Sequence, residues 1–273
     1  MAFKTLLTHV GRDQASTLRL QAAAALAGDL GALLIGLAAE APPPYLLDSF
    51  GVATAQWLPV VVEEQAKAAL AAHRAFREQT VGVHSAWLSS REPPTQALAR
   101  HARAADLIVV GGGDEGGPPF CTVKSGELLV TAGRPLLVAP INGGRLTPRR
   151  ILIAWKDTRE SRRAVADALP FLLQAESITI VALCGKGELD ETRAQAEDVA
   201  GWLKRQGAAP PLCQCAEAPS DLVDAELLAK AEAMRADLVV AGGYGHSRAA
   251  EWLVGGVTHT LLRRPDLFVF LSH

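Results

Sequence analysis

Several features that mark whole classes of protein are missing from this sequence. No apolar run approaches the roughly 20 residues of a membrane-spanning helix. The opening stretch, MAFKTLLTHVGRDQ, has no basic region, long apolar core or small-residue cleavage site of a secretion signal. The net charge is only -2, so no overall charge draws the chain to nucleic acid or to an acidic membrane. These absences predict a cytoplasmic protein that binds neither nucleic acid nor membrane.

Cysteine is scarce, with four among 273 residues. Cys121 is isolated and Cys184 lies near the end of an expected strand. Cys213 and Cys215 lie in another expected strand with one residue between them. None of the four has the spacing of a zinc site, and no group of histidine and carboxylate residues has metal-ligand spacing either. We therefore expect buried or half-buried reduced thiols and predict no metal centre.

Two parts of the chain follow the same plan. ARAADLIVVGGGDEG (102–116) and AMRADLVVAGGYGHS (233–247) each end a helical pattern, pass through a β-branched run and exit into glycines. KTLLTHVGRDQAS near the start matches RRILIAWKDTRES, and RPLLVAP matches the closing DLFVFLSH. We therefore predict two similar domains, residues 1–141 and 149–273, joined by the Gly-, Pro- and Arg-rich linker INGGRLTPRR.

In the second domain, short apolar runs alternate with helical patterns. This alternation is typical of right-handed βαβ units and of a parallel sheet with helices on both faces. Continuous apolar runs such as ILIAW and LFVFL suit buried strands. The expected strands are 151–155, 177–183, 212–216, 238–241 and 267–271, and the expected helices are 161–173, 189–206, 220–235 and 257–264.

The first domain carries an insertion, APPPYLLDSFGVATAQWLP, at residues 41–59. Its three consecutive prolines exclude a regular helix at that point. We expect a surface loop, while a lid over a site or a contact with another subunit stays open as an alternative.

The glycines after residue 241 are spaced as a phosphate-binding loop would need them. Two residues separate Gly242 from Gly245, and nine more separate Gly245 from Gly255. Gly255 and Gly256 then precede a helical pattern in which Thr258 supplies a hydroxyl. In open parallel sheets, ligands bind beyond the carboxyl ends of the strands. Glycines at a helix N-terminus expose N–H donors with the positive end of the helix dipole behind them. The alternative is a strand–helix connection that needs glycine only for its turns.

This spacing resembles the nucleotide loop of the universal stress protein family, whose pattern is G-x2-G-x9-G-[S/T]. Both halves show the family's order of strands and helices, so the chain resembles a tandem, two-domain member. The resemblance implies an α/β fold in which each domain is a five-stranded parallel sheet with helices on both faces, of the adenine-nucleotide α-hydrolase-like kind. It also implies ATP binding in many members and none in others, and pairing of domains through their last strands.

The resemblance further implies an adenine nucleotide, ATP or ADP with or without Mg²⁺, as a ligand that is not required for folding. The implied nucleotide-binding residues lie on the glycine loop and at the ends of the first two strands of the second domain. They are Gly242, Gly245, His246, Ser247, Gly255, Gly256, Val257, Thr258, Lys156, Asp157 and Leu183.

Two positions of the second domain depart from the family pattern. Gly256 stands where the family usually has Ser or Thr, so one hydroxyl is lost while the backbone donor stays. Lys156 stands where ATP-binding members usually carry Asp, and Asp157 follows one residue later. The lysine could approach phosphate, block the adenine pocket or be solvated.

The first domain departs much further. Asp114 and Glu115 follow its glycines, and carboxylates there would repel a phosphate. Pro118 and Pro119 remove N–H donors, and Val10 followed by glycine replaces the acid at the end of the first strand. We infer that this half has lost the phosphate site and acts as a partner domain.

Three functions are compatible with this sequence. The first is a regulatory, nucleotide-binding stress-response protein, and the second is an assembly or scaffold protein whose phosphate loop is a relic. The third is an enzyme, for which the sequence offers little: it has no P-loop, Rossmann fingerprint or nucleophile elbow. Weak ATP hydrolysis would need Mg²⁺ and a residue that orients water, and Asp157 and His246 are the candidates.

The last strand of each half, LLVAP and LFVFL, is an apolar sheet edge if unpaired. Such edges tend to pair with another edge. We therefore expect the two halves to pair through these strands as an internal pseudo-dimer, and a further homodimer stays open.

Overall fold

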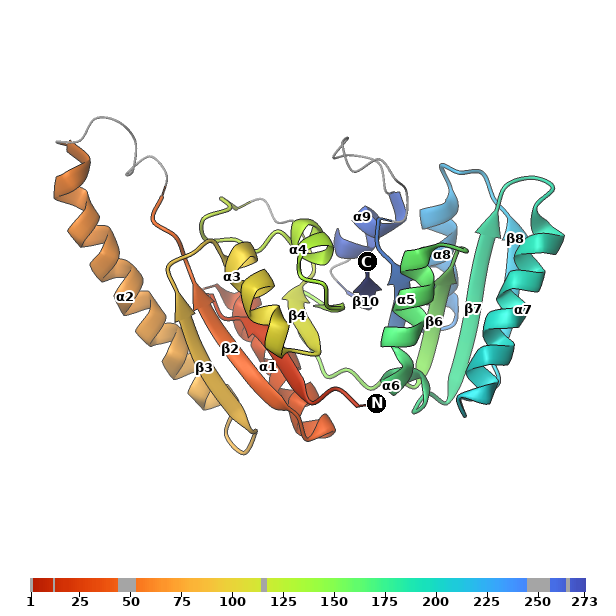
Figure 1. Cartoon of the computed structure of the whole chain (residues 1–273), viewed down its shortest axis with the longest axis horizontal. Coiled ribbons are helices and arrows are strands. Elements are labelled where there is room, and N and C mark those ends of the chain that lie inside the picture. Colours follow the sequence, from red (N-terminus) through yellow and green to blue (C-terminus); the bar gives the residue numbers. More distant parts are fainter. Residues whose placement is uncertain (1, 12, 44–52, 114–116, 245–255, 264–265) are drawn as a thin grey trace. The chain divides into compact units, whose positions relative to one another are not determined.

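The computed structural model describes residues 2–11, 13–43, 53–113, 117–244, 256–263 and 266–273. The chain divides into two compact units. The N-terminal unit comprises Phe3–Arg134 with Ile141–Arg145, and the C-terminal unit comprises Pro135–Pro140 and Leu146–His273 with the first two residues. Figure 1 shows strands flanked by helices in each unit.

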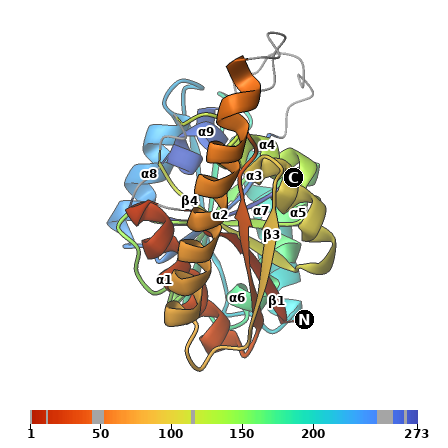
Figure 2. The ribbon, with the colours of Figure 1, turned by 90° about the vertical axis from the view of Figure 1, so that its left-hand side faces the viewer.

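The N-terminal unit contains a parallel sheet with the strand order β3-β2-β1-β4. Helix α1 packs against α2, and α3 packs against α4. Figure 2 shows these two pairs on opposite faces of the sheet. The strands are β1 (Thr5–His9), β2 (Leu33–Ala39), β3 (Ser85–Ser90) and β4 (Leu107–Gly111); the helices are α1 (Gln14–Leu30), α2 (Ala53–Gln79), α3 (Pro94–His101), the short 3₁₀ turn η2 (Ala102–Ala104) and α4 (Ser125–Thr131).

The C-terminal unit contains the strand order β5-β10-β9-β6-β7-β8. All neighbours are parallel except β5, which runs antiparallel to β10 with Val138 opposite Val269. The strands are β5 (Leu136–Ala139), β6 (Arg150–Trp155), β7 (Ser177–Cys184), β8 (Leu212–Glu217), β9 (Leu238–Gly242) and β10 (Phe268–Ser272); the helices are α5 (Arg159–Asp167), α6 (Leu169–Leu172), α7 (Leu189–Arg205), α8 (Val223–Ala233) and α9 (Gly256–Arg263). These bounds agree with the expected elements to within a few residues, except that the single helix expected at 161–173 is divided into α5 and α6.

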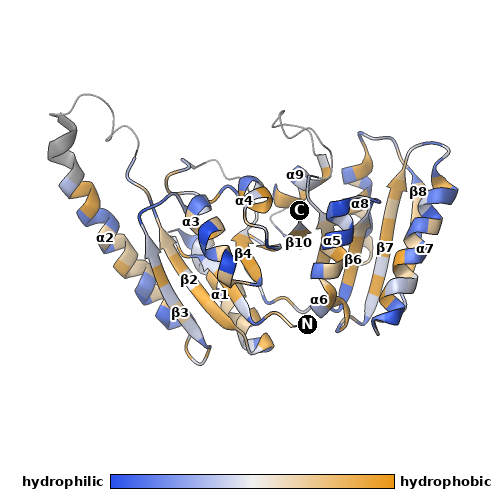
Figure 3. Cartoon of the chain, in the orientation of Figure 1, coloured by the Kyte–Doolittle hydropathy of each residue, from blue (hydrophilic) through white to orange (hydrophobic). Residues whose placement is uncertain are grey.

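Most strands form because each is a short, nearly continuous apolar run that can be covered on both faces, whereas β3 and β8, at the ends of the strand order, are more polar and partly exposed. Leu152 and Ile153 of β6 and Val239 of β9 are at most 1% exposed. Figure 3 shows β2 and β4 as largely apolar strands. The helices end where the sequence supplies caps: Asp13 accepts a hydrogen bond from the Ser16 N–H before α1. Gly31 closes the same helix at φ 59°, a conformation that favours glycine.

The interpretation of residues 41–59 as a surface loop is wrong for residues 53–59, which form the first turns of α2. The three consecutive prolines end before this helix begins. Pro59 lies inside the helix and removes one backbone donor, but the 20 residues that follow are rich in Ala and also contain Glu, Gln and Arg, which favour helix. The helix reaches 27 residues, against 17 for α7 in the other unit. Residues 44–52 lie outside the described residues.

Cys184 is buried and Cys121, Cys213 and Cys215 are half-buried, all as free thiols, as expected. Burial raises the pKa of the Cys213 and Cys215 thiols above the usual range. In the described part of the chain, no helix combines the length and apolar character needed to cross a membrane.

Candidate functional site

The carboxyl ends of β6 and β9 meet where the strand order of the C-terminal unit changes direction. The chain passes from β6 through β7 to β8 on one side, and β9 and β10 then lie on the other side of β6. Ligands of open parallel sheets bind at such a switch point. Lys156 and Asp157 follow β6, and Gly242 ends β9, so the fold brings these three predicted residues to one edge of the sheet.

Gly242 packs directly against the start of α5. A Cβ atom at this position would lie 2.5 Å from the backbone nitrogen of Ser161 and 2.7 Å from the carbonyl carbon of Glu160. Real Cβ atoms do not approach backbone this closely, so only glycine fits between strand and helix. Helix–strand packing therefore accounts for this glycine whether or not a ligand binds.

The first residues of the glycine loop are held by the end of the neighbouring strand. The Gly243 N–H donates to the Ser272 carbonyl oxygen over 2.8 Å. The Gly243 carbonyl oxygen lies 2.9 Å from Nδ1 of His273. Because a carbonyl oxygen only accepts, Nδ1 carries the hydrogen in this contact. Tyr244 follows at φ 55°, a left-handed conformation uncommon for a residue with a side chain.

Thr258 connects the two ends of the glycine loop. Its hydroxyl oxygen accepts a hydrogen bond from the Tyr244 N–H over 3.3 Å, and the residue is only 5% exposed. The hydroxyl hydrogen can still be donated to a ligand. Gly256, two residues earlier, begins α9, and among the described residues a Cβ atom there would meet nothing within 4 Å. The first turn of α9 contains no acidic residue, so the helix start is electropositive.

The remaining described residues of the predicted set lie around this edge. Asp157 is exposed and forms an ion pair with Arg162 on α5, with 2.8 Å between nitrogen and oxygen. Lys156 is exposed after β6, Leu183 is half-buried in β7, and Val257 is half-buried in α9. The other four, Gly245, His246, Ser247 and Gly255, lie outside the described residues.

Two buried polar groups flank the same edge. Burial raises the pKa of the Glu160 carboxyl, but hydrogen bonds from its own backbone N–H and from Arg159 outweigh this and leave the pKa lowered overall. Trp155, at the end of β6, is 6% exposed. Within the described residues its indole nitrogen is the one buried side-chain nitrogen or oxygen without a hydrogen-bond partner.

The corresponding edge of the N-terminal unit is occupied by an arginine. Nε and one terminal nitrogen of Arg19 donate to the His9 carbonyl oxygen over 3.4 and 3.0 Å, and the same terminal nitrogen donates to Ser16 Oγ over 3.1 Å. The other terminal nitrogen lies 2.9 Å from where a Gly111 Cβ would be. The guanidinium therefore lies between the ends of β1 and β4, the place that corresponds to the β6–β9 edge.

Buried His9 stays neutral beside this guanidinium. Its Nε2 hydrogen is donated to the Ala39 carbonyl oxygen over 3.1 Å. Burial, assisted by the positive charge of Arg19, lowers the pKa of His9 to about 4. Asp114 and Glu115, expected to repel phosphate here, lie outside the described residues.

Solved structures with the same arrangement of strands and helices are known. A universal stress protein from Archaeoglobus fulgidus DSM 4304 superposes with a TM-score of 0.71 and 13% identity, covering 98% of this chain and 97% of that one. The chain has the fold of a universal stress protein. No protein-family model and no curated protein matches the sequence.

Two further full-length structures share the universal stress protein fold with this chain. A protein from Pseudomonas aeruginosa UCBPP-PA14, provisionally assigned to the universal stress proteins, has a TM-score of 0.60 and 16% identity, over 99% of this chain and 93% of that one. A functionally unknown protein from P. aeruginosa PAO1 has a TM-score of 0.59 and 17% identity, over 99% and 92%. The expected α/β fold, with two similar units of parallel strands and helices, is confirmed.

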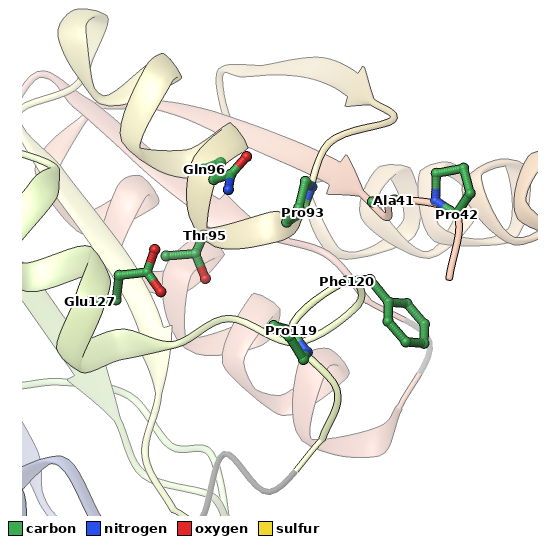
Figure 4. Close-up of a pocket in the computed structure, with 8 residues that line it drawn as sticks. All are labelled: Ala41, Pro42, Pro93, Thr95, Gln96, Pro119, Phe120 and Glu127. Atoms are coloured by element: carbon green, nitrogen blue, oxygen red, sulfur yellow. The ribbon is translucent and has the colours of Figure 1, made fainter. Parts of the chain in front are cut away.

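Sequence reasoning missed several residues that build these edges of the universal stress protein fold. Nothing in the local pattern marks His273, which contacts a residue 30 positions away, or Arg19, a single basic residue in an alanine-rich helix. It also missed a hollow of about 350 Å³ beyond the carboxyl ends of β2 and β3, bounded by Pro93, Pro119 and Phe120 (Figure 4). Of the prolines that line it, only Pro119 was interpreted as a lost N–H donor.

Proposed function

We propose that the protein is a tandem universal stress protein that binds an adenine nucleotide, ATP or ADP, at the carboxyl edge of the C-terminal unit. The observation that carries the proposal is the bridge from the Thr258 hydroxyl to the Tyr244 N–H. It holds the two ends of the glycine loop together beside the start of α9 at Gly256. A phosphate at this place would meet backbone N–H donors, the hydroxyl hydrogen of Thr258 and the dipole of α9.

The charges around this edge also suit a phosphate. Lys156 is an exposed cation after β6. The Asp157 carboxylate forms an ion pair with Arg162, which offsets its negative charge. Within the described residues, no three His, Cys, Asp or Glu side chains are grouped as metal ligands. Mg²⁺ would therefore accompany the nucleotide through its phosphates and water.

The role we assign to the bound nucleotide is regulatory. Binding shifts a conformational equilibrium only by the difference in affinity between two states. The first half lacks the equivalent opening because Arg19 lies across it. The loop would then be the one nucleotide-dependent element, and the N-terminal domain its partner.

The arrangement of two domains, residues 1–141 and 149–273, is part of the same proposal. Their last strands would pair the halves within one chain, and the antiparallel register of Val138 with Val269 supports this pairing. We place this protein in the cytoplasm. There it would bind partner proteins through its surface, either as a monomer or as a homodimer.

The second candidate is an assembly protein whose loop is a relic. The observation that favours it is the packing of Gly242 against the backbone of Ser161, which explains that glycine without any ligand. Under this candidate, the C-terminal unit would keep its shape but hold no nucleotide.

One experiment separates the two candidates. The protein is purified without added ligand and denatured, and any released nucleotide is identified by mass spectrometry. Gly245→Asp, which places a carboxylate in the glycine loop, is treated in the same way, with Gly201→Asp on α7, where an added Cβ atom meets only the end of the Arg205 side chain, as the control. Release of ATP or ADP from the wild type and the control, but not from Gly245→Asp, supports the nucleotide site. No nucleotide from any of them, with no rise in Tm on adding Mg-ATP, supports the assembly role.

A further inference from the structure

In the N-terminal unit, residues 117–124, which lead into α4, are held by hydrogen bonds to neighbouring elements and form a wall. The Lys124 N–H donates to the hydroxyl oxygen of Thr95 over 2.9 Å. The Lys124 ammonium group donates to the Gly117 carbonyl oxygen over 2.9 Å. At the other side, the Ala41 N–H donates to the Phe120 carbonyl oxygen over 2.8 Å. The segment is therefore attached to α3 and to the end of β2.

Two further contacts stiffen the same segment. A Cβ atom at Gly117 would collide with the hydroxyl oxygen of Thr122, so this turn closes tightly on itself. The N–H groups of Cys121 and Thr122 both donate to the Pro118 carbonyl oxygen, over 3.1 and 3.0 Å. The prolines that removed phosphate-binding donors thus belong to a preformed structure.

This wall forms one side of the hollow of about 350 Å³, which is open to solvent and has a size at the lower end of small-molecule sites. Figure 4 shows its side chains in three groups: Ala41, Pro42 and Phe120 at one end, Pro93 and Pro119 in the middle, and Thr95, Gln96 and Glu127 at the other end. One end is therefore apolar and ring-lined, and the other is polar. All eight residues belong to the N-terminal unit.

The charge of the hollow is opposite to that of the edge at Gly256. Glu127 is the one charged residue among the eight, and its carboxylate would repel phosphate. Thr95 uses its oxygen to accept from Lys124 but keeps a hydrogen to donate, and Gln96 offers an amide. Proline and phenylalanine rings provide flat apolar walls, and Phe120 can also face a cation.

We propose that this hollow is a binding site for a small molecule that combines an apolar ring with a primary amine. The ring lies between Phe120 and the prolines, and the ammonium group is held by Glu127 with support from Gln96. The site goes beyond the proposed nucleotide function and does not rest on it.

The test uses three matched probes on the full chain: 4-fluorobenzylamine, 4-fluorobenzyl alcohol and 4-fluorobenzoate, each titrated by ¹⁹F NMR. The expected order is amine, then alcohol, then benzoate. Because Glu127 is exposed, we expect an advantage of about three- to five-fold in Kd for the amine over the alcohol. Benzoate should bind no more tightly than the alcohol.

Two variants locate the binding. Glu127→Gln should remove the advantage of the amine and leave the Kd of the alcohol unchanged, whereas Glu232→Gln, an exposed acid in the other unit, should change neither. Ala41→Phe fills the ring end of the hollow and should abolish binding of both amine and alcohol. Tm measurements on each variant establish that it is folded.

The proposal is overturned if the amine binds Ala41→Phe as well as it binds wild type, or if benzoate binds as tightly as the amine. Absence of binding by all three probes to the folded wild type would also overturn it. None of these outcomes bears on nucleotide release from the C-terminal unit, which is measured separately.

Discussion

The backbone N–H of Tyr244 and the hydroxyl oxygen of Thr258 are 3.3 Å apart, although 14 positions separate the two residues in the chain. One residue follows β9 and the other lies in the first turn of α9. The hydrogen bond therefore sets the distance between the two ends of the glycine loop.

Thr258→Val keeps the shape of the side chain and removes the acceptor. The Tyr244 N–H then loses its partner in a part-buried place, which we expect to lower the free energy of unfolding by about 1–3 kcal/mol. Affinity for Mg-ATP, measured by calorimetry, should fall as well. Thr258→Ser keeps the hydroxyl and is the control. Equal stability and equal affinity of the two variants would contradict the role given to this contact.

Gly242→Ala and Gly256→Ala make the same chemical change at positions with opposite surroundings. The first methyl group meets the backbone of Ser161, so α5 or β9 must shift, and we expect destabilisation of about 2–4 kcal/mol. The second meets open space at the start of α9, so stability should change by no more than about 1 kcal/mol. Denaturant unfolding followed by circular dichroism measures both. A large loss from Gly256→Ala would mean that the helix start is closed.

His9 should make the protein less stable in mild acid. Its pKa is about 4 in the folded protein and 6.5 for the unperturbed group, so between these values the unfolded chain binds more protons. The contribution of neutral His9 is complete above pH 6.5 and is lost as the pH falls towards 4. At pH 5 the loss amounts to about 2 kcal/mol.

His9→Gln retains a donor for the Ala39 carbonyl oxygen without a titrating ring. Unfolding free energies of wild type and variant are compared at pH 7.5 and pH 5. We expect the difference between the two pH values to be about 2 kcal/mol smaller for the variant. An identical pH dependence would show that the ring is not buried as a neutral group.

Val269→Pro tests the pairing of the last strands. β10 lies between β5 and β9, and proline removes an N–H and distorts a strand with neighbours on both sides. Tm should fall and the hydrodynamic radius should rise. Val269→Ala loses side-chain volume but keeps the N–H, so it should lower Tm less and leave the radius unchanged. Proline without effect on either quantity would contradict the pairing.

Much of the fold could be predicted because strands and helices leave local patterns. The apolar run of β6 and the alanine-rich pattern of α1 each reflect the burial of one short segment, which the segment's own residues encode. The repeat of these patterns indicated two similar α/β units. The prediction for residues 53–59 was wrong because the loop inferred from the proline triplet was extended too far along the chain. Pro59 alone did not prevent these residues from forming a helix.

The candidate site was predictable only in part. Loop spacing pointed to Gly242 and Thr258, and both lie at the expected edge. Spacing could not distinguish a glycine needed for a ligand from one needed for packing, because that distinction depends on what lies beside it. Gly242 faces the backbone of Ser161, while Gly256 faces open space.

The linear order of residues was thus enough to establish the repeated units, the order of their elements and the loop on which a nucleotide site is proposed. Contacts between distant positions were decided by the folded chain alone. Lys124 meets Thr95 across 29 positions, and His273 meets Gly243 across 30. Such pairs leave no periodic signal, because folding brings together segments that are far apart in the chain: the start of α4 meets α3, and the end of β10 meets the end of β9. The hollow at Glu127 exists for the same reason.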